Sequence, residues 1–195
     1  MIPVRATGCD SDVKQVTDLR NRLAMLDGVD FCLVQEISNE TCTGAFDLLF
    51  CMEVLEHVVD PAAVIDDLHR LLAPAGTLVV SVPVETGIPL LIKQTARRVW
   101  GMRSTLQDYK GNSRYTAGEL VRSVFASSKP NIVRPIHVEG RDRFHDHKGF
   151  NWRYMRSLLE RCFDIEQCFG SPLRLLPPGL GSQVWFVCRH RTRRS

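Results

Sequence analysis

The chain has 195 residues, of which 44% are hydrophobic and 24% are charged, and its formal net charge is +3. These totals are typical of a globular protein with one hydrophobic core, so we expect a single domain over residues 1–195. The small net charge does not favour nucleic acid as a partner. The sequence contains no run of about 18 apolar residues, the length that a membrane-spanning helix needs.

The cysteines indicate a reduced, cytoplasmic protein. There are seven, an odd number, and no two of them form a Cys-x-x-Cys pair. Four lie in apolar, strand-like runs, where a thiol behaves as a small hydrophobic group: Cys9, Cys32, Cys51 and Cys188. This usage fits neither a disulfide framework nor a zinc site.

The first 34 residues predict a strand, a helix and a second strand, at residues 4–10, 12–26 and 29–34. Asp10 ends the first strand, where a carboxylate can accept hydrogen bonds from both hydroxyls of a ribose. Asp10, Ser11 and Asp12 are also all suited to capping the helix that follows. Both interpretations stay open at this point.

The most regular pattern lies between residues 46 and 83. An apolar run at 46–52 is followed by Asp60-Pro61, a typical helix start, and by apolar residues at helical spacing from 64 to 72. Pro-Ala-Gly at 74–76 ends that helix, and a second apolar run covers 77–82. The order predicts a right-handed βαβ unit, whose parallel strands end at a ligand cleft.

The segment 84–146 is too long to be a simple crossover connection between two strands. We expect it to form an insertion that covers a substrate. Helices are predicted at 88–100 and 116–126, a polar stretch at 107–113 and a loop at 129–143. His137 and His145 could line a substrate pocket, but we expect them to be solvated loop histidines. The basic residues of this part should line a solvated helix face; they are Lys93, Arg97, Arg98 and Arg103.

The C-terminal part returns to a regular pattern, with a helix at 151–161 and strands at 163–169 and 183–188. A loop rich in Pro and Gly joins the two strands, and residues 189–195 form a basic tail.

The order of strand, helix, turn and strand from residue 46 to residue 82 resembles the middle of the class I S-adenosylmethionine-dependent methyltransferases. It is similar to the branch of that family that contains the ubiquinone-pathway O-methyltransferases. The resemblance rests on Glu-Val-Leu-Glu-His at 53–57, Asp-Pro at 60–61 and the Leu-x-Pro-x-Gly turn at 72–76. It implies an α/β fold with a Rossmann-like methyltransferase sheet, mostly parallel with a C-terminal antiparallel strand pair. The implied activity is methyl transfer to an oxygen, nitrogen or carbon nucleophile of a small-molecule, lipid or glycan-type substrate.

The resemblance also implies which residues contact S-adenosyl-L-methionine. The strand-end carboxylate, with its neighbour, would hold the ribose; a polar side chain after the third strand would meet the adenine; and the end of the fourth strand would flank the cofactor. In this sequence these positions are Asp10 and Ser11, Gln35 and Glu36, and Cys51 and Met52. Gln35 departs from the family pattern, although an amide still offers both a donor and an acceptor.

One family element is missing from the sequence, because no glycine-rich G-x-G-x-x-G or G-x-G-x-G loop occurs in it. In the family, a first strand and this loop precede the element that corresponds to residues 4–10. We therefore expect the fold to be N-terminally incomplete, so that two strands of the sheet lack the neighbouring strand they would pair with. We also expect this chain alone to be an incomplete enzyme. The alternative is a degenerate domain that acts as a non-catalytic binding module.

Three polar residues at the mouth of the predicted cleft are the catalytic candidates. Glu53, Glu56 and His57 share one face of a helical turn. His57 could act as a general base with Glu53 beside it, or the group could form a hydrogen-bond network at the helix start. Together with His147, the same side chains could also bind a divalent metal ion, as the resemblance to small-RNA 2′-O-methyltransferases implies. The sequence does not decide between these three hypotheses.

Overall fold

The computed structural model describes residues 5–37, 42–99, 114–140 and 142–191. The chain divides into two compact units, residues 1–45 and 46–195, which are described separately below. The predictions for Arg103, for the polar stretch at 107–113 and for the last four residues of the basic tail lie outside the described residues.

The first unit contains a two-stranded parallel sheet and two helices. Its elements are β1 (Ala6–Asp10), α1 (Val13–Arg22), β2 (Val29–Leu33) and α2 (Val34–Ile37). The predicted order of strand, helix and strand is confirmed, but α1 ends four residues before the predicted end. Leu23 leaves the helical conformation, with φ −111° and ψ 13°, and its N–H still bonds to the backbone oxygen of Leu19.

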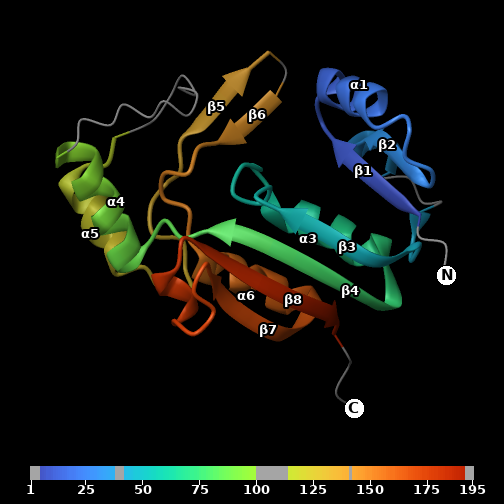
Figure 1. Ribbon diagram of the computed structural model, residues 1–195. Helices are drawn as coiled ribbons and strands as arrows, with labels where there is room; N and C mark the ends of the chain where they lie inside the picture. The colour runs from blue at the N-terminus through green and yellow to red at the C-terminus, as the bar shows by residue number, and fades with distance from the viewer. Residues whose placement is uncertain (1–4, 38–41, 100–113, 141, 192–195) are drawn as a thin grey trace. The chain divides into compact units, whose positions relative to one another are not determined.

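A four-stranded sheet forms the centre of the second unit, in the order β3-β4-β8-β7 (Figure 1). The strands are β3 (Phe46–Met52), β4 (Leu72–Pro83), β7 (Phe163–Ser171) and β8 (Gln183–His190), and a short 3₁₀ helix, η2 (Pro178–Leu180), lies between the last two. β3 and β4 are parallel, whereas β8 runs antiparallel to both β4 and β7. The Rossmann-like sheet with a C-terminal antiparallel strand pair is thus confirmed.

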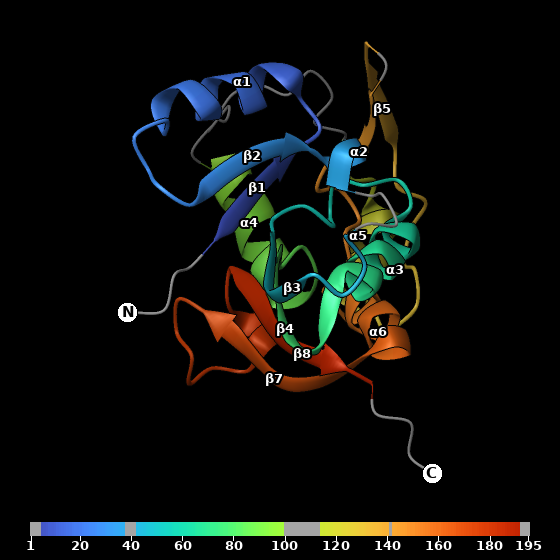
Figure 2. The same cartoon turned by 90° about the vertical axis from the view of Figure 1, so that its right-hand side faces the viewer.

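Two helices cover one face of this sheet, α3 (Pro61–Leu71) and α6 (Trp152–Cys162), and they pack against each other (Figure 2). Each begins where the sequence predicts, because Asp60 and Asn151 accept hydrogen bonds from the first free N–H groups of their helices. Between helices and sheet lies the hydrophobic core, which includes Leu55, Ile65, Val80, Leu159 and Phe186.

Residues 84–146 include two helices, α4 (Gly87–Val99) and α5 (Ala117–Val124), which lie side by side. Thr116 and Glu119 form a reciprocal capping box at the start of α5. A hairpin of β5 (Ile136–Glu139) and β6 (Asp142–His145) follows. No helix in the described ranges is long and apolar enough to cross a membrane.

Three sequence predictions are wrong in detail. β4 begins at Leu72, five residues before the predicted start at 77, because Pro-Ala-Gly at 74–76 is accommodated by a register shift against β3. The predicted loop at 129–143 contains β5 and the first half of β6, since backbone pairing between the two short segments outweighs their weak strand propensity. The basic tail starts later than predicted, because β8 continues to His190 and pairs with Phe163 of β7.

Candidate active site

The turn between β3 and α3, residues 53–58, carries all three catalytic candidates of the sequence. Glu53 has φ +55°, a left-handed conformation that is rare for a residue with a Cβ atom. Two hydrogen bonds to Ser81 at the end of β4 hold it there: its N–H donates to the backbone oxygen, and its Oε1 accepts from Ser81 Oγ at 3.2 Å. Glu53 is therefore fixed between the carboxyl ends of two parallel strands, where ligands bind in open α/β sheets.

His57 is fixed by two reciprocal hydrogen bonds to His145 in β6. The N–H of His145 donates to the backbone oxygen of His57 at 2.8 Å, and Nδ1 of His57 lies 3.0 Å from the backbone oxygen of His145. Because a carbonyl oxygen only accepts, Nδ1 carries the proton. In the neutral imidazole, Nε2 then holds the lone pair, which is the state that a general base requires.

Glu56 is completely buried, and neither of its carboxylate oxygens has a hydrogen-bond partner among the described residues. Burial, more than the charge of nearby Glu53, raises the pKa of Glu56 to about 8. Its Oε1 lies 3.8 Å from Nε2 of His57. An uncompensated buried carboxyl is costly, so its place beside His57 points to a functional role.

His147 completes this group, because its ring meets the ring of His57 edge to face, with centroids 4.9 Å apart. Desolvation, followed by the nearby His57, lowers the pKa of His147. The structure thus places Glu53, Glu56 and His57 on a turn instead of the expected helical face, and it brings His147 from the segment after β6 close to them. In the described part of the chain, no group of three or more such side chains has an arrangement suited to a metal ion.

Arg134 ties the turn to the segment that contains His147. Its Nη2 donates to the backbone oxygens of Glu56 and Asp146, and its Nε donates to that of Lys148. The guanidinium also lies over the ring of Phe150, 5.3 Å from the ring centroid. Burial lowers the pKa of Arg134 to about 10, so it stays charged at neutral pH.

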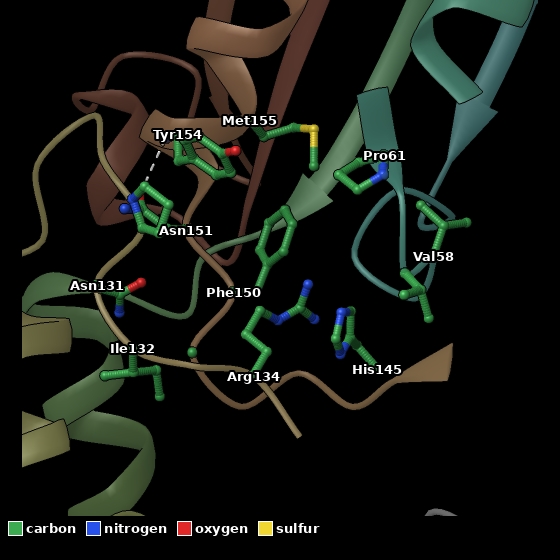
Figure 3. A pocket seen from close by; sticks show the side chains of 13 residues that line it. Val58, Pro61, Asn131, Ile132, Arg134, His145, Phe150, Asn151, Tyr154 and Met155 are labelled. Atoms are coloured by element: carbon green, nitrogen blue, oxygen red, sulfur yellow. Dashed lines mark hydrogen bonds between the residues drawn. The ribbon is translucent and has the colours of Figure 1, made fainter. Parts of the chain in front are cut away.

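Behind the turn is a cavity of about 170 Å³, lined by residues from segments 58–61, 130–134 and 145–155 (Figure 3). Three of its polar side chains are bonded to backbone: Arg134 as above, His145 Nδ1 to the oxygen of Pro135, and Asn151 Nδ2 to the oxygens of Ser127 and Lys129. The cavity therefore lies inside a framework that supports His57. The prediction that His145 is solvated is wrong, since it is buried and lines the cavity.

In the first unit, Asp10 lies at the carboxyl end of β1, as predicted. The helix cap is Asp12, whose side chain accepts from the N–H of Lys14, so Asp10 is not needed as the cap of α1. One oxygen of Asp10 accepts from the N–H of Asp12 at 2.8 Å, and Ser11 lies exposed between the two. A carboxylate has two oxygens, so this bond leaves capacity for a ligand hydroxyl.

The remaining predicted cofactor positions differ in exposure. Gln35 and Glu36 both lie in α2 and are both exposed, and a carboxylate oxygen of Glu36 accepts from the N–H of Leu33 at 3.0 Å. At the end of β3, Met52 is half exposed, but Cys51 is buried in the core. Met52 is thus the more accessible residue of its pair, and exposure does not separate Gln35 from Glu36.

Sequence reasoning missed Arg134 and the role of His145. Both act through backbone oxygens, which any residue supplies, so no motif identifies their partners. The one available signal was a lone Arg in a segment otherwise rich in Pro and apolar residues, at 130–136.

The chain matches a family model described as a methyltransferase domain over residues 8–164. It is 56% identical over 41 residues to a ubiquinone biosynthesis O-methyltransferase of Psychrobacter cryohalolentis, a stretch that covers 21% of this chain and 16% of that enzyme. For the enzyme of the same name from Xanthomonas oryzae pv. oryzae, identity is 50% over 48 residues, or 25% of this chain and 20% of the relative. The chain thus spans a fifth or less of the length of the curated relatives it matches.

Among solved structures, the PH0226 protein from Pyrococcus horikoshii OT3 has a similar fold, with a TM-score of 0.59. The match covers 96% of this chain and 72% of that protein, at 12% sequence identity. At this level of identity, the likeness concerns the fold alone.

Proposed function

Because the chain belongs to the family of class I S-adenosylmethionine-dependent methyltransferases, we propose that it contributes the acceptor side of a methyl-transfer site. The substrate class is a small molecule, lipid or glycan with an oxygen, nitrogen or carbon nucleophile. The observation that carries the proposal is the fixed tautomer of His57, with Nδ1 bonded to the oxygen of His145 and Nε2 free to accept a proton.

The residues present fit the nucleoside half of S-adenosyl-L-methionine, which supplies an activated methyl group when bound. Asp10 suits the ribose, because the capping role falls to Asp12 and one carboxylate oxygen keeps accepting capacity. The exposed amide of Gln35 suits adenine, and Met52 extends from the end of β3. The other candidates of the same stretches are Ser11 and Glu36, which are exposed, and Cys51, which is buried.

In the proposed mechanism, His57 removes the proton from the substrate nucleophile at Nε2. Its Nδ1–H stays on the oxygen of His145, so the ring keeps its orientation while its charge changes. A positive charge on His57 favours ionisation of Glu56, whose Oε1 is 3.8 Å away, and the pair can share the charge. Glu53 contributes a carboxylate fixed at the strand ends by Ser81.

The insertion at 84–146 would cover the substrate, and the seven free cysteines suit a cytoplasmic setting. A non-catalytic binding module remains the second candidate, because the sequence has no glycine-rich loop for the methionine end of the cofactor. The two candidates differ in one respect: a binding module needs no proton acceptor at His57.

Kinetics of His57 variants test the proposal. The assay uses a chimaera that carries the first strand and glycine-rich turn of a ubiquinone biosynthesis O-methyltransferase at its N-terminus, with the acceptor of that relative as the test substrate. His57→Ala should lower the methylation rate by about 10²–10⁴-fold, the usual contribution of a general base, and shift Tm by only a few degrees. The matched control is His137→Ala, at a histidine of β5, the strand that pairs with β6. This variant should methylate at the rate of the unmutated chimaera.

A rate that is unchanged in His57→Ala would contradict the proposed role. If activity is instead lost on EDTA treatment and in His147→Ala alike, the metal hypothesis replaces the general base.

A further inference from the structure

The sheet of the first unit brings two thiols into contact. Cys9 in β1 and Cys32 in β2 are direct partners in the parallel register, and their Sγ atoms are 3.4 Å apart. Neighbouring strands lie about 4.8 Å apart, which is within the range of Cα separations that a disulfide bridges. No change in strand register is needed to join these two sulfurs.

This pair differs from the cysteines of the second unit's core. Cys51 and Cys188 are buried, as expected for thiols that act as small hydrophobic groups, whereas Cys9 is exposed and Cys32 is partly exposed. Cys9 therefore does not act as the buried hydrophobic group that its apolar strand predicts. An accessible pair of adjacent thiols in a protein without disulfides is typical of a redox-responsive site.

We propose that Cys9 and Cys32 form a redox-active dithiol, which a small-molecule disulfide such as glutathione disulfide converts into a cross-strand disulfide. This modification site does not depend on the proposed methyl transfer. Asp10 directly follows Cys9, so the bond would form beside the strand end that carries the proposed ribose contact.

The reaction is two successive thiol–disulfide exchanges. The Sγ atom of Cys32, as thiolate, attacks one sulfur of the small disulfide; a mixed disulfide forms and one small thiolate leaves. The Sγ atom of Cys9 then attacks the sulfur of Cys32, and the second small thiolate leaves. The two protons of the cysteines end on the two released thiols, the cysteines are oxidised, and the small disulfide is reduced.

The environment of Cys9 favours this order. Partial desolvation of its sulfur, followed by the contact with Cys32, raises the pKa of Cys9 to about 12. Because the thiolate is the attacking species, the raised pKa makes Cys9 a poor first nucleophile, and we assign the first attack to Cys32. The short distance between the sulfurs makes the second step intramolecular and favours the disulfide over a lasting mixed adduct.

Mass spectrometry of one fragment tests the proposal. The reduced chain is incubated with glutathione disulfide, remaining thiols are blocked with iodoacetamide, and the protein is cleaved after Glu. The first Glu in the sequence is Glu36, so the fragment 1–36 contains Cys9 and Cys32 and no other cysteine. We expect this fragment to carry no blocking group and to be lighter by about 2 Da than its reduced, unblocked form.

Trypsin gives a second readout, because it cleaves after Lys14 and Arg22, between the two cysteines. The linked peptides 6–14 and 23–70 should then appear as one species, which separates on reduction. Cys32→Ser should abolish this species. Cys42→Ser is the matched control and should retain it.

The proposal is overturned if fragment 1–36 is blocked at both cysteines after oxidation, or if it ends only as a glutathione adduct. It is also overturned if the fragment is joined to 41–53, since that would place the bond at Cys42 or Cys51. Because the fragment comes from the unmutated chain, the result does not depend on whether a serine variant folds.

Discussion

The two compact units differ in how much apolar surface they bury. In the second unit, side chains such as Leu78, Val80 and Phe186 have no exposed surface, and they belong to one continuous core. Among the described residues of the first unit, Val16 is the one apolar side chain that is buried. The second unit thus has a core of its own, whereas a two-stranded sheet with so little burial is marginal in water.

This difference in burial sets the residues proposed to contact the methyl acceptor apart from those proposed to contact the nucleoside. Glu53, Glu56 and His57 lie on a turn supported by the large core, but Asp10 and Gln35 lie in the unit with little core. We therefore expect the acceptor side to be rigid and the nucleoside side to depend on stabilisation from elsewhere. The predictions below test this contrast.

The largest effect is expected in the core of the second unit. Phe186→Ala should lower the free energy of unfolding by about 3–5 kcal/mol, because it leaves a cavity at a completely buried position. Val13→Ala in α1, where the side chain is 61% exposed, should change it by about 0.5 kcal/mol or less. Urea titrations measure both; similar losses in the two variants would remove the contrast.

Removal of the Arg134 guanidinium should have the next largest effect. Arg134→Met leaves the buried backbone oxygens of Glu56, Asp146 and Lys148 without this donor, so we expect a loss of about 2–4 kcal/mol. Arg122→Met, at an exposed position of α5, is the control and should be nearly neutral. Equal stability of the two variants in urea would show that Arg134 does not support the turn.

Glu56 should make stability depend on pH. Its pKa is about 8 in the folded chain and near 4.5 when unfolded, so the native state holds the proton and the unfolded state releases it. The stability of the wild type is then full below pH 4.5 and falls as the pH rises through about 8. Relative to Glu56→Gln, we expect the wild type to lose about 2 kcal/mol between pH 5 and pH 7.

Thermal unfolding of both proteins at several pH values measures this difference. Parallel stability curves from pH 5 to pH 8 would show that the Glu56 carboxyl is not held neutral. Asp67→Asn, at an exposed position of α3, controls for a general change in surface charge.

The parts of the fold that the sequence predicted are those with local signals. The βαβ unit at 46–83 follows from two apolar runs and the cap at Asp60-Pro61, and Asn151 marks the start of α6 in the same way. The β5–β6 hairpin was missed, because its strands have four residues each and depend on pairing with each other.

The site was predictable only in part, for a related reason. The strand ends gave Asp10, Glu53 and His57, since ligand-facing positions follow from topology. Arg134 was not predictable, because its contact with the backbone of Glu56 spans 78 residues and involves no particular partner side chain. The burial of Glu56 likewise results from tertiary packing, and it reverses the usual expectation that a carboxylate is exposed.

The most direct test of the proposed methyl-transfer site is calorimetric titration of S-adenosylhomocysteine into the chain alone, the chimaera and the chimaera with Asp10→Ala. We predict weak or no binding to the chain alone and clear binding to the chimaera. Asp10→Ala should weaken that binding by about 1–3 kcal/mol, the usual contribution of a hydrogen-bonded charged group. Equal affinities for the chain alone and the chimaera, or no effect of Asp10→Ala, would contradict the account.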